Sequence, residues 1–91
     1  MADPEHHYLL YYEYVEDILD RRTPYRDAHL AAIRGAQDDG RILMAGPLGD
    51  PPRGAAIVFG DRDAAEAFAQ ADPYVLNGLV ADWRVDLWKL V

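Results

Sequence analysis

Several residue types that carry chemistry in proteins are scarce or missing. The chain has no cysteine and no serine, and Thr23 is its single threonine. The lack of cysteine excludes disulfide bonds and thiolate metal sites, and it agrees with a reducing compartment. Thr23 stands directly before a proline, where a role at a helix start explains it. A serine, threonine or cysteine nucleophile is therefore excluded as the basis of catalysis.

Long apolar runs and basic segments are absent as well. No apolar run approaches the roughly 18 to 20 residues that a membrane-spanning helix requires. The opening MADPEHHYLL lacks the basic and apolar regions of a signal peptide. The formal net charge of −7, with Lys89 as the only lysine, repels the phosphate backbone of nucleic acids. We therefore expect a cytoplasmic protein with no membrane and no nucleic-acid partner.

What the chain does contain is enough for one modest hydrophobic core. It has 91 residues, of which 51% are hydrophobic, and this is not the composition of a disordered protein. Repeats, linkers and low-complexity tracts are missing. We expect a single domain over residues 1–91, in which residues 1–6 form a flexible tail.

Alternating apolar residues predict strands, and apolar residues at helical spacing predict helices. Thr23 is expected to cap the first helix, and Asp63 with Glu66 three residues later is expected to begin the second as a capping box. Asp72, followed by a proline, should end that second helix. In chain order, we expect a strand at 7–15, an irregular link at 16–22, a helix at 23–39, strands at 41–48 and 55–59, a helix at 63–71 and a strand at 79–91.

This order is β-α-β-β-α-β, which is the ferredoxin-like arrangement of an α+β fold with an antiparallel sheet. Two helices cover only one face of a four-stranded sheet. The strand at 7–15 is nevertheless apolar on both faces, and Trp83 and Trp88 fall on opposite faces of the last strand. A second copy of the chain would cover the bare face, so we expect a homodimer. The alternative is that some of these aromatic side chains are half-exposed.

Candidate catalytic residues lie on the first helix and at the end of the second. Arg26 and His29 are three residues apart and therefore neighbours on one helix face. A carboxylate beside a histidine fixes the imidazole tautomer, and Asp72 is a plausible partner because both helices lie on the same face of the sheet. The alternative is that His29 binds a backbone carbonyl and Asp72 only caps a turn.

Other patterns that suggest cofactors or metals are weak. His6 and His7 are adjacent on a strand and point to opposite faces, so they do not chelate one ion together. The segment AGPLGDPPRG has glycines, but it lacks the spacing of a phosphate-binding loop and no lysine follows. Flavin, nicotinamide and haem motifs are not found. We therefore expect neither a cofactor nor a metal.

Three segments together resemble the YCII-related (YciI-like) family. They are RDAHLAAIRGAQDDGRILMAGPL at 26–48, FAQADPYVLNGLV at 68–80, and the closing aromatic strand. The family pattern has R-x-x-H-L, then a glycine and arginine before A-G-P, and then A-D-P-Y with a glycine four residues after the tyrosine. The resemblance covers nearly the whole chain, and its specificity comes from three segments in the right order. The tail before it is longer than usual, and the loop at 49–54 is short.

The resemblance implies a ferredoxin-like fold that dimerises through its sheets as a dimeric α+β barrel. It also implies a cleft in which a histidine and an aspartate meet as an acid/base pair. On this sequence, the catalytic residues implied are His29 and Asp72. The substrate-binding residues implied are Arg26, Tyr74, Gly46 and Pro47.

Two functions follow from this resemblance. The first is an acid/base enzyme without a cofactor, a lyase, isomerase or dehydrochlorinase-like protein acting on a small aromatic or lactone-like molecule. One relative removes chloride from a chlorinated hydroxyquinol, and muconolactone isomerases share the barrel more distantly. The alternative is a non-catalytic dimeric module that binds a small anion or metabolite, or assists a larger enzyme. The residues do not separate the two, because binding requires the same side chains.

Overall fold

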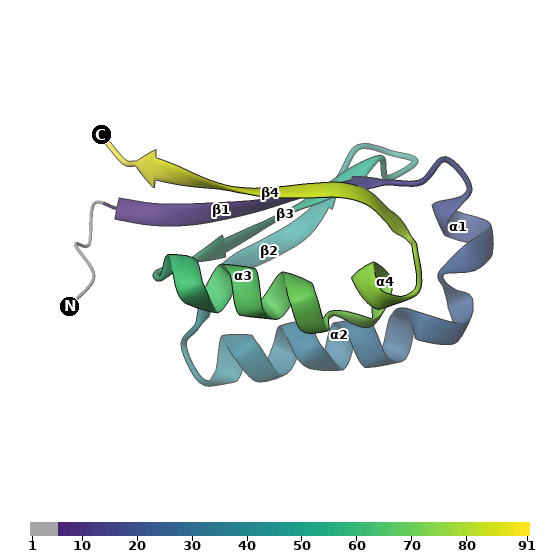
Figure 1. Ribbon diagram of the computed structural model, residues 1–91, viewed down its shortest axis with the longest axis horizontal. Coiled ribbons are helices and arrows are strands. Elements are labelled where there is room, and N and C mark those ends of the chain that lie inside the picture. Colours follow the sequence, from purple (N-terminus) through teal and green to yellow (C-terminus); the bar gives the residue numbers. More distant parts are fainter. Residues whose placement is uncertain (1–5) are drawn as a thin grey trace.

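The antiparallel sheet of the computed structural model, which describes residues 6–91, has the strand order β2-β3-β1-β4. Its strands are β1 (His6–Tyr14), β2 (Ile42–Leu48), β3 (Gly54–Phe59) and β4 (Val80–Lys89). The helices are α1 (Ile18–Arg21), α2 (Thr23–Asp38), α3 (Arg62–Ala71) and α4 (Pro73–Leu76). The two long helices lie on one side of the sheet (Figure 1). The predicted α+β class and ferredoxin-like order are therefore confirmed.

The hydrophobic core lies between the sheet and the two long helices. The central strand β1 supplies Leu10, which pairs with Ile57 of β3 and Val85 of β4. Phe59 and Phe68 meet in the same cluster with ring centroids 5.6 Å apart. Alternate residues of a strand point to opposite faces, so the even-numbered residues of β1 face the helices. Tyr12 belongs to this set and is fully buried.

Two helix starts differ from their sequence prediction. Residues 16–22 are not wholly irregular, because α1 forms there around Ile18, which is buried against Tyr74. The prediction that Thr23 caps α2 is wrong: Arg22 precedes it in a helical conformation, and no side chain caps this helix. A capping side chain needs an extended residue at that position, and the turn coming from α1 does not provide one.

The second long helix begins one residue earlier than the predicted capping box. Asp61 is extended and its side chain accepts a hydrogen bond from the backbone N–H of Ala64 at 3.0 Å, so it is the cap of α3. The prediction that Asp63 begins this helix is therefore wrong. Asp63 lies in the first turn, where its charge complements the positive end of the helix dipole.

Asp72 separates α3 from α4, and this junction positions the candidate site. Its backbone is extended, with φ −66° and ψ 127°, so the helix ends there as predicted. Its side chain then accepts a hydrogen bond from the backbone N–H of Tyr74 and caps α4, with Pro73 at the first helical position. The sequence prediction did not include α4.

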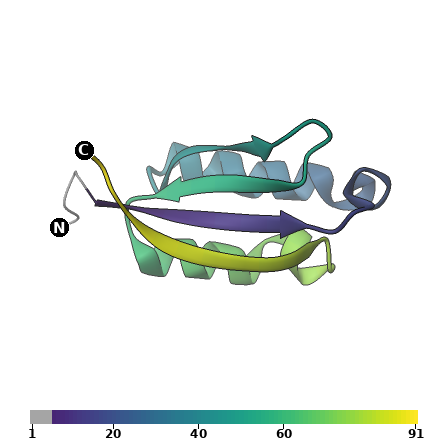
Figure 2. The ribbon, with the colours of Figure 1, turned by 90° about the horizontal axis from the view of Figure 1, so that it is seen from above.

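The face of the sheet opposite the helices carries no layer of its own among residues 6–91 (Figure 2). Met44 is 61% exposed and Trp88 is 44% exposed. Residues 1–5 of the predicted tail lie outside the described part of the chain, and His6 begins β1. Within the described part, none of the helices combines the length and the hydrophobicity needed to cross a membrane.

Candidate active site

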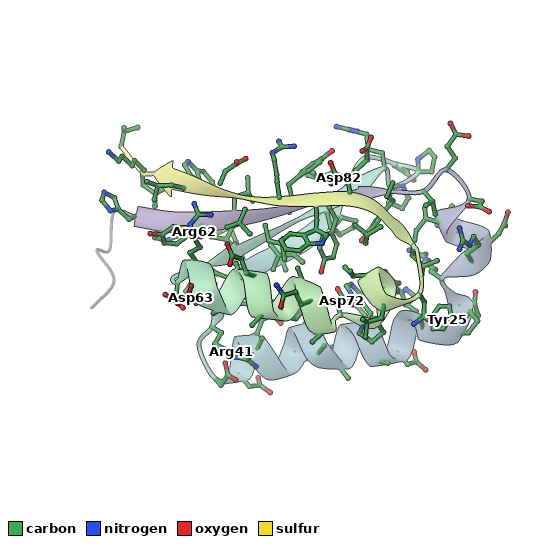
Figure 3. The ribbon with its side chains drawn as sticks, viewed as in Figure 1. Tyr25, Arg41, Arg62, Asp63, Asp72 and Asp82 are labelled. Carbon is green, nitrogen blue, oxygen red and sulfur yellow. The ribbon has the colours of Figure 1, made fainter. Side chains whose placement is uncertain are left out.

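A buried histidine and a buried aspartate are in direct contact between the helices and the sheet. His29 lies in the middle of α2, and its Nδ1 is 2.8 Å from Oδ1 and 2.9 Å from Oδ2 of Asp72. The exposed fraction is 7% for His29 and 1% for Asp72. Figure 3 labels Asp72 at the end of α3, beside α2. The turn after α3 therefore brings a carboxylate to the imidazole across 43 residues of sequence.

Two further donors fix the position of this carboxylate. The Tyr12 hydroxyl donates to Oδ2 of Asp72 at 2.8 Å, and the backbone N–H of Tyr74 donates to Oδ1 at 3.0 Å. A carboxylate only accepts hydrogen bonds, so Nδ1 of His29 donates to it. In the neutral imidazole, Nε2 then carries the lone pair. This is the tautomer that a general base requires.

The remaining ring nitrogen is open to the outside. Among residues 6–91, Nε2 of His29 has no hydrogen-bond partner, and it is not sealed from solvent. The Tyr74 ring stacks on the imidazole with centroids 3.8 Å apart and planes 7° from parallel. Tyr14 in turn meets Tyr74 edge-on at 6.1 Å. Stacking and the bond to Asp72 together hold the imidazole in one orientation.

Three phenols surround the pair, and each is held in its neutral form. Burial raises the pKa of Tyr12 well above its ordinary value near 10, and the charge and hydrogen bond of Asp72 add to this effect. Burial likewise raises the pKa of Tyr14. The pKa of Tyr74 is also raised by burial, although the charges of Arg22 and Arg26 oppose the shift. The phenols are hydrogen-bond donors at neutral pH.

A pocket of about 170 Å³ opens beside His29. The substrate-binding residues expected from the sequence, Arg26, Tyr74, Gly46 and Pro47, all line it. Asp72 does not line the pocket, but its carboxylate is hydrogen-bonded to two residues that do, His29 and Tyr74. Its full lining is Tyr14, Arg22, Arg26, His29, Leu30, Ile33, Ala45, Gly46, Pro47, Ile57 and Tyr74.

Three residues of this region were not expected from the sequence. Arg22 lies in the stretch that was interpreted as an irregular link, and Tyr14 lies at the end of a strand that is apolar on both faces. Tyr12 lies on the same face of β1 as Leu10, which is buried. That shared face was the only sequence feature that indicated a position of Tyr12 near His29 and Asp72. A tyrosine in such a strand is more often a core residue than a partner of a catalytic group.

Comparison with known proteins shows the family of this chain. The model of the YCII-related domain matches residues 7–89. The chain belongs to the YCII-related domain family. Protein YciI of Escherichia coli O6:H1 is 36% identical over 95 residues, which cover 92% of this chain and 97% of YciI. A protein of Haemophilus influenzae is 30% identical over 96 residues, covering 93% and 98%.

Solved structures also resemble this YCII-related chain. One is 5-chloro-2-hydroxyhydroquinone dehydrochlorinase (TftG) of Burkholderia phenoliruptrix AC1100 in complex with 2,5-dihydroxybenzoquinone. It has a TM-score of 0.74 and 25% identity, and the match covers 91% of this chain and 93% of that one. A conserved protein of Methanosarcina mazei Go1 has a TM-score of 0.55 at 6% identity and covers 94% and 92%, which indicates a shared fold only.

The described part of this YCII-related chain, residues 6–91, contains no group of three or more histidine, cysteine, aspartate or glutamate side chains arranged to hold a metal ion. His6 and His7 are consecutive residues of β1 and pair with Lys89 and Trp88 respectively. The side chains that gather around His29 are instead phenols, guanidinium groups and a carboxylate that is already hydrogen-bonded. This set of groups is suited to binding anionic oxygen and to moving protons.

The phenol of Tyr12 in this YCII-related chain makes folding sensitive to alkaline pH. Its pKa is raised in the folded protein, so the folded state holds more protons than the unfolded state above pH 10, and stability falls as pH rises. For one such group the slope approaches about 1.4 kcal/mol per pH unit. We expect Tyr12→Phe to have a shallower decline in the free energy of unfolding, measured by urea titration between pH 8 and 11.5. Parallel curves for the two proteins would show that Tyr12 does not carry this effect.

Proposed function

We propose that this YCII-related chain is a proton-transfer enzyme that needs no cofactor and acts on a small ring-shaped molecule. One observation carries the proposal: His29 is hydrogen-bonded through Nδ1 to a buried carboxylate, while its other nitrogen has no hydrogen-bond partner among residues 6–91 and its ring lines a pocket. An oriented imidazole of this kind is the usual general base of enzymes near neutral pH.

The chemistry follows from the two ends of the imidazole. Nε2 takes a proton from a carbon or oxygen of the substrate, and the bonding electron pair stays on the substrate. Asp72 stabilises the imidazolium that forms, because its carboxylate faces the Nδ1–H at 2.8 Å. In an isomerisation, the imidazolium then returns the proton at another atom of the substrate. In an elimination, the electron pair expels a leaving group and the imidazolium releases its proton to water.

A likeness to a known enzyme supports this proposal. The dehydrochlorinase from Burkholderia acts on a chlorinated hydroxyhydroquinone, as its name states, and its structure holds a dihydroxybenzoquinone. Loss of hydrogen chloride from such a ring is a proton transfer coupled to the departure of chloride. We carry over to this chain only the reaction type, because one fold hosts many substrates.

Exchange with heavy water tests the proposal without knowledge of the product. The protein is incubated in D₂O with mixtures of small quinols, lactones and ring acids, and mass spectrometry identifies compounds that gain deuterium faster than in buffer. We expect at least one compound class to exchange in a His29-dependent manner. The alternative, a non-catalytic module that binds a small anion, predicts ligand binding but no catalysed exchange with any of them.

We also propose that the open face of the sheet is covered by a second copy of the chain. A hollow of about 360 Å³ lies on this face, lined mainly by apolar side chains that include Leu9, Met44, Val58 and Trp88. Apolar surface of this kind is rarely left bare in a monomer. Homodimers are the commonest oligomers and bury such a patch against itself.

Sedimentation tests the dimer directly. We expect a species of twice the 10.2 kDa chain mass at micromolar concentration. Met44→Glu places a charge in the hollow and should yield monomers, whereas Leu76→Glu, at a 67% exposed position on α4, should not. A wild-type protein that sediments at the mass of one chain would contradict the proposal.

The cytoplasmic location expected from the sequence stays a prediction.

A further inference from the structure

Two arginines of the pocket differ from most others in the chain. Arg22 and Arg26 both line the pocket, and within residues 6–91 the guanidinium group of neither takes part in an ion pair or a hydrogen bond. Four other arginines are paired with nearby carboxylates. These are Arg21 with Asp17, Arg41 with Asp39, Arg62 with Glu66, and Arg84 with Asp86. The Arg22 and Arg26 side chains have no such partner within residues 6–91, although the chain is rich in acidic residues.

Their placement opposes the stability of α2. Arg22 precedes the helix and Arg26 lies one turn later, so two like charges are neighbours on one helix face. Both stand at the end of the helix where its dipole disfavours cations, and the first turn contains no acidic residue. Within α2, this arrangement is electrostatically unfavourable. An anion in the pocket would remove the conflict, since it would be shared by both guanidinium groups.

The rest of the pocket is suited to a flat apolar body. Ile33 and Ile57 contribute to its lining, and Pro47 lies beside them. An apolar cavity of about 150 Å³ is known to hold one benzene molecule. The 170 Å³ available here therefore accommodates one six-membered ring with a small substituent.

The spacing of residues along α2 determines how far each arginine of the pocket lies from His29. With a rise of about 1.5 Å per residue, Arg26 lies about 4.5 Å and Arg22 about 10 Å from His29 along the helix axis. We propose that the pocket takes a ring-sized organic acid, whose carboxylate is held by Arg22 and Arg26 while the ring lies against Ile33 and Ile57. Binding of such an acid does not depend on the proposed function. Only one further statement rests on that function, namely that the substrate atom nearest His29 is the one that reacts.

Binding of benzoate tests the substrate class. Titrations of the wild-type protein with benzoate, with benzamide as its neutral analogue and with inorganic phosphate are followed by NMR. We expect benzoate to shift the His29 ring signals saturably, and to bind at least tenfold more tightly than either benzamide or phosphate. Arg22→Gln and Arg26→Gln should each weaken benzoate binding about tenfold. Arg34→Gln should leave it unchanged, because Arg34 is exposed on the same helix and does not line the pocket.

The possible results separate this inference from the proposed function. Equal binding of benzamide, equal binding of phosphate, no binding of benzoate, or unchanged affinity in both pocket variants would each overturn the organic-acid class. None of these results affects proton exchange that depends on His29. Conversely, tight arginine-dependent binding of benzoate without catalysed exchange of any compound would support the ring-acid site and contradict the enzyme.

Discussion

His29→Gln is expected to slow catalysed deuterium exchange by about 10²- to 10⁴-fold, the usual contribution of a positioned general base. Glutamine is similar in length and its amide can still donate to Asp72, so the buried carboxylate keeps a partner. It has no basic nitrogen to accept a proton from the substrate. The rate is measured by mass spectrometry on whichever compound the wild-type protein exchanges fastest.

Thermal unfolding of the same variant provides the control for this result. A folded His29→Gln protein with a melting temperature close to that of wild type isolates the chemical role. Exchange at the wild-type rate in such a protein would remove His29 as the base. Arg34→Gln, on the same helix outside the pocket, should exchange at the wild-type rate.

Asp72→Ala is expected to have the largest effect on stability, with a loss of about 3–5 kcal/mol in the free energy of unfolding. Three donors lose their acceptor in this variant: the imidazole Nδ1–H, the Tyr12 hydroxyl and the Tyr74 amide. All three lie at buried positions, so water replaces the lost bonds poorly. The short helix α4 also loses its cap. Urea titration at neutral pH measures the difference.

Asp61→Ala is the matched comparison for this prediction. Asp61 caps α3 through a single hydrogen bond at an exposed position, so its removal should cost only about 1 kcal/mol. Equal losses in the two variants would mean that Asp72 acts only as a helix cap. A larger loss for Asp72→Ala by a few kcal/mol is what the buried network requires.

The order of elements could be predicted from sequence because local patterns encode it. Alternating apolar residues in the strands, and apolar residues at helical spacing in the two helices predicted at 23–39 and 63–71, were sufficient to predict the ferredoxin-like arrangement. The caps were less predictable, because the residue at the cap position is extended in α3, where it is Asp61, but helical in α2, where it is Arg22. The turn that leads into α2 comes from α1, which packs through Ile18 against Tyr74 and Leu79.

The site was predictable only in part. His29 and Asp72 were candidates because their helices share one face of the sheet, and the family resemblance pointed to the same pair. The contact itself depends on the turn between α3 and α4, which no local pattern specifies. Tyr12 was missed because its strand is apolar on both faces, so nothing in its neighbourhood distinguishes a phenol beside a carboxylate from a core side chain. Arg22 was missed because a link was expected there.

The tautomer of His29 tests the central claim most directly. Nitrogen-15 NMR of the imidazole distinguishes a protonated ring nitrogen from one with a free lone pair, and it needs no substrate. In the neutral ring, we expect the proton on Nδ1, donated to Asp72, and the lone pair on Nε2 in the pocket. A neutral ring with its proton on Nε2 would contradict this account, because the nitrogen that faces the pocket would then have no lone pair with which to accept a proton.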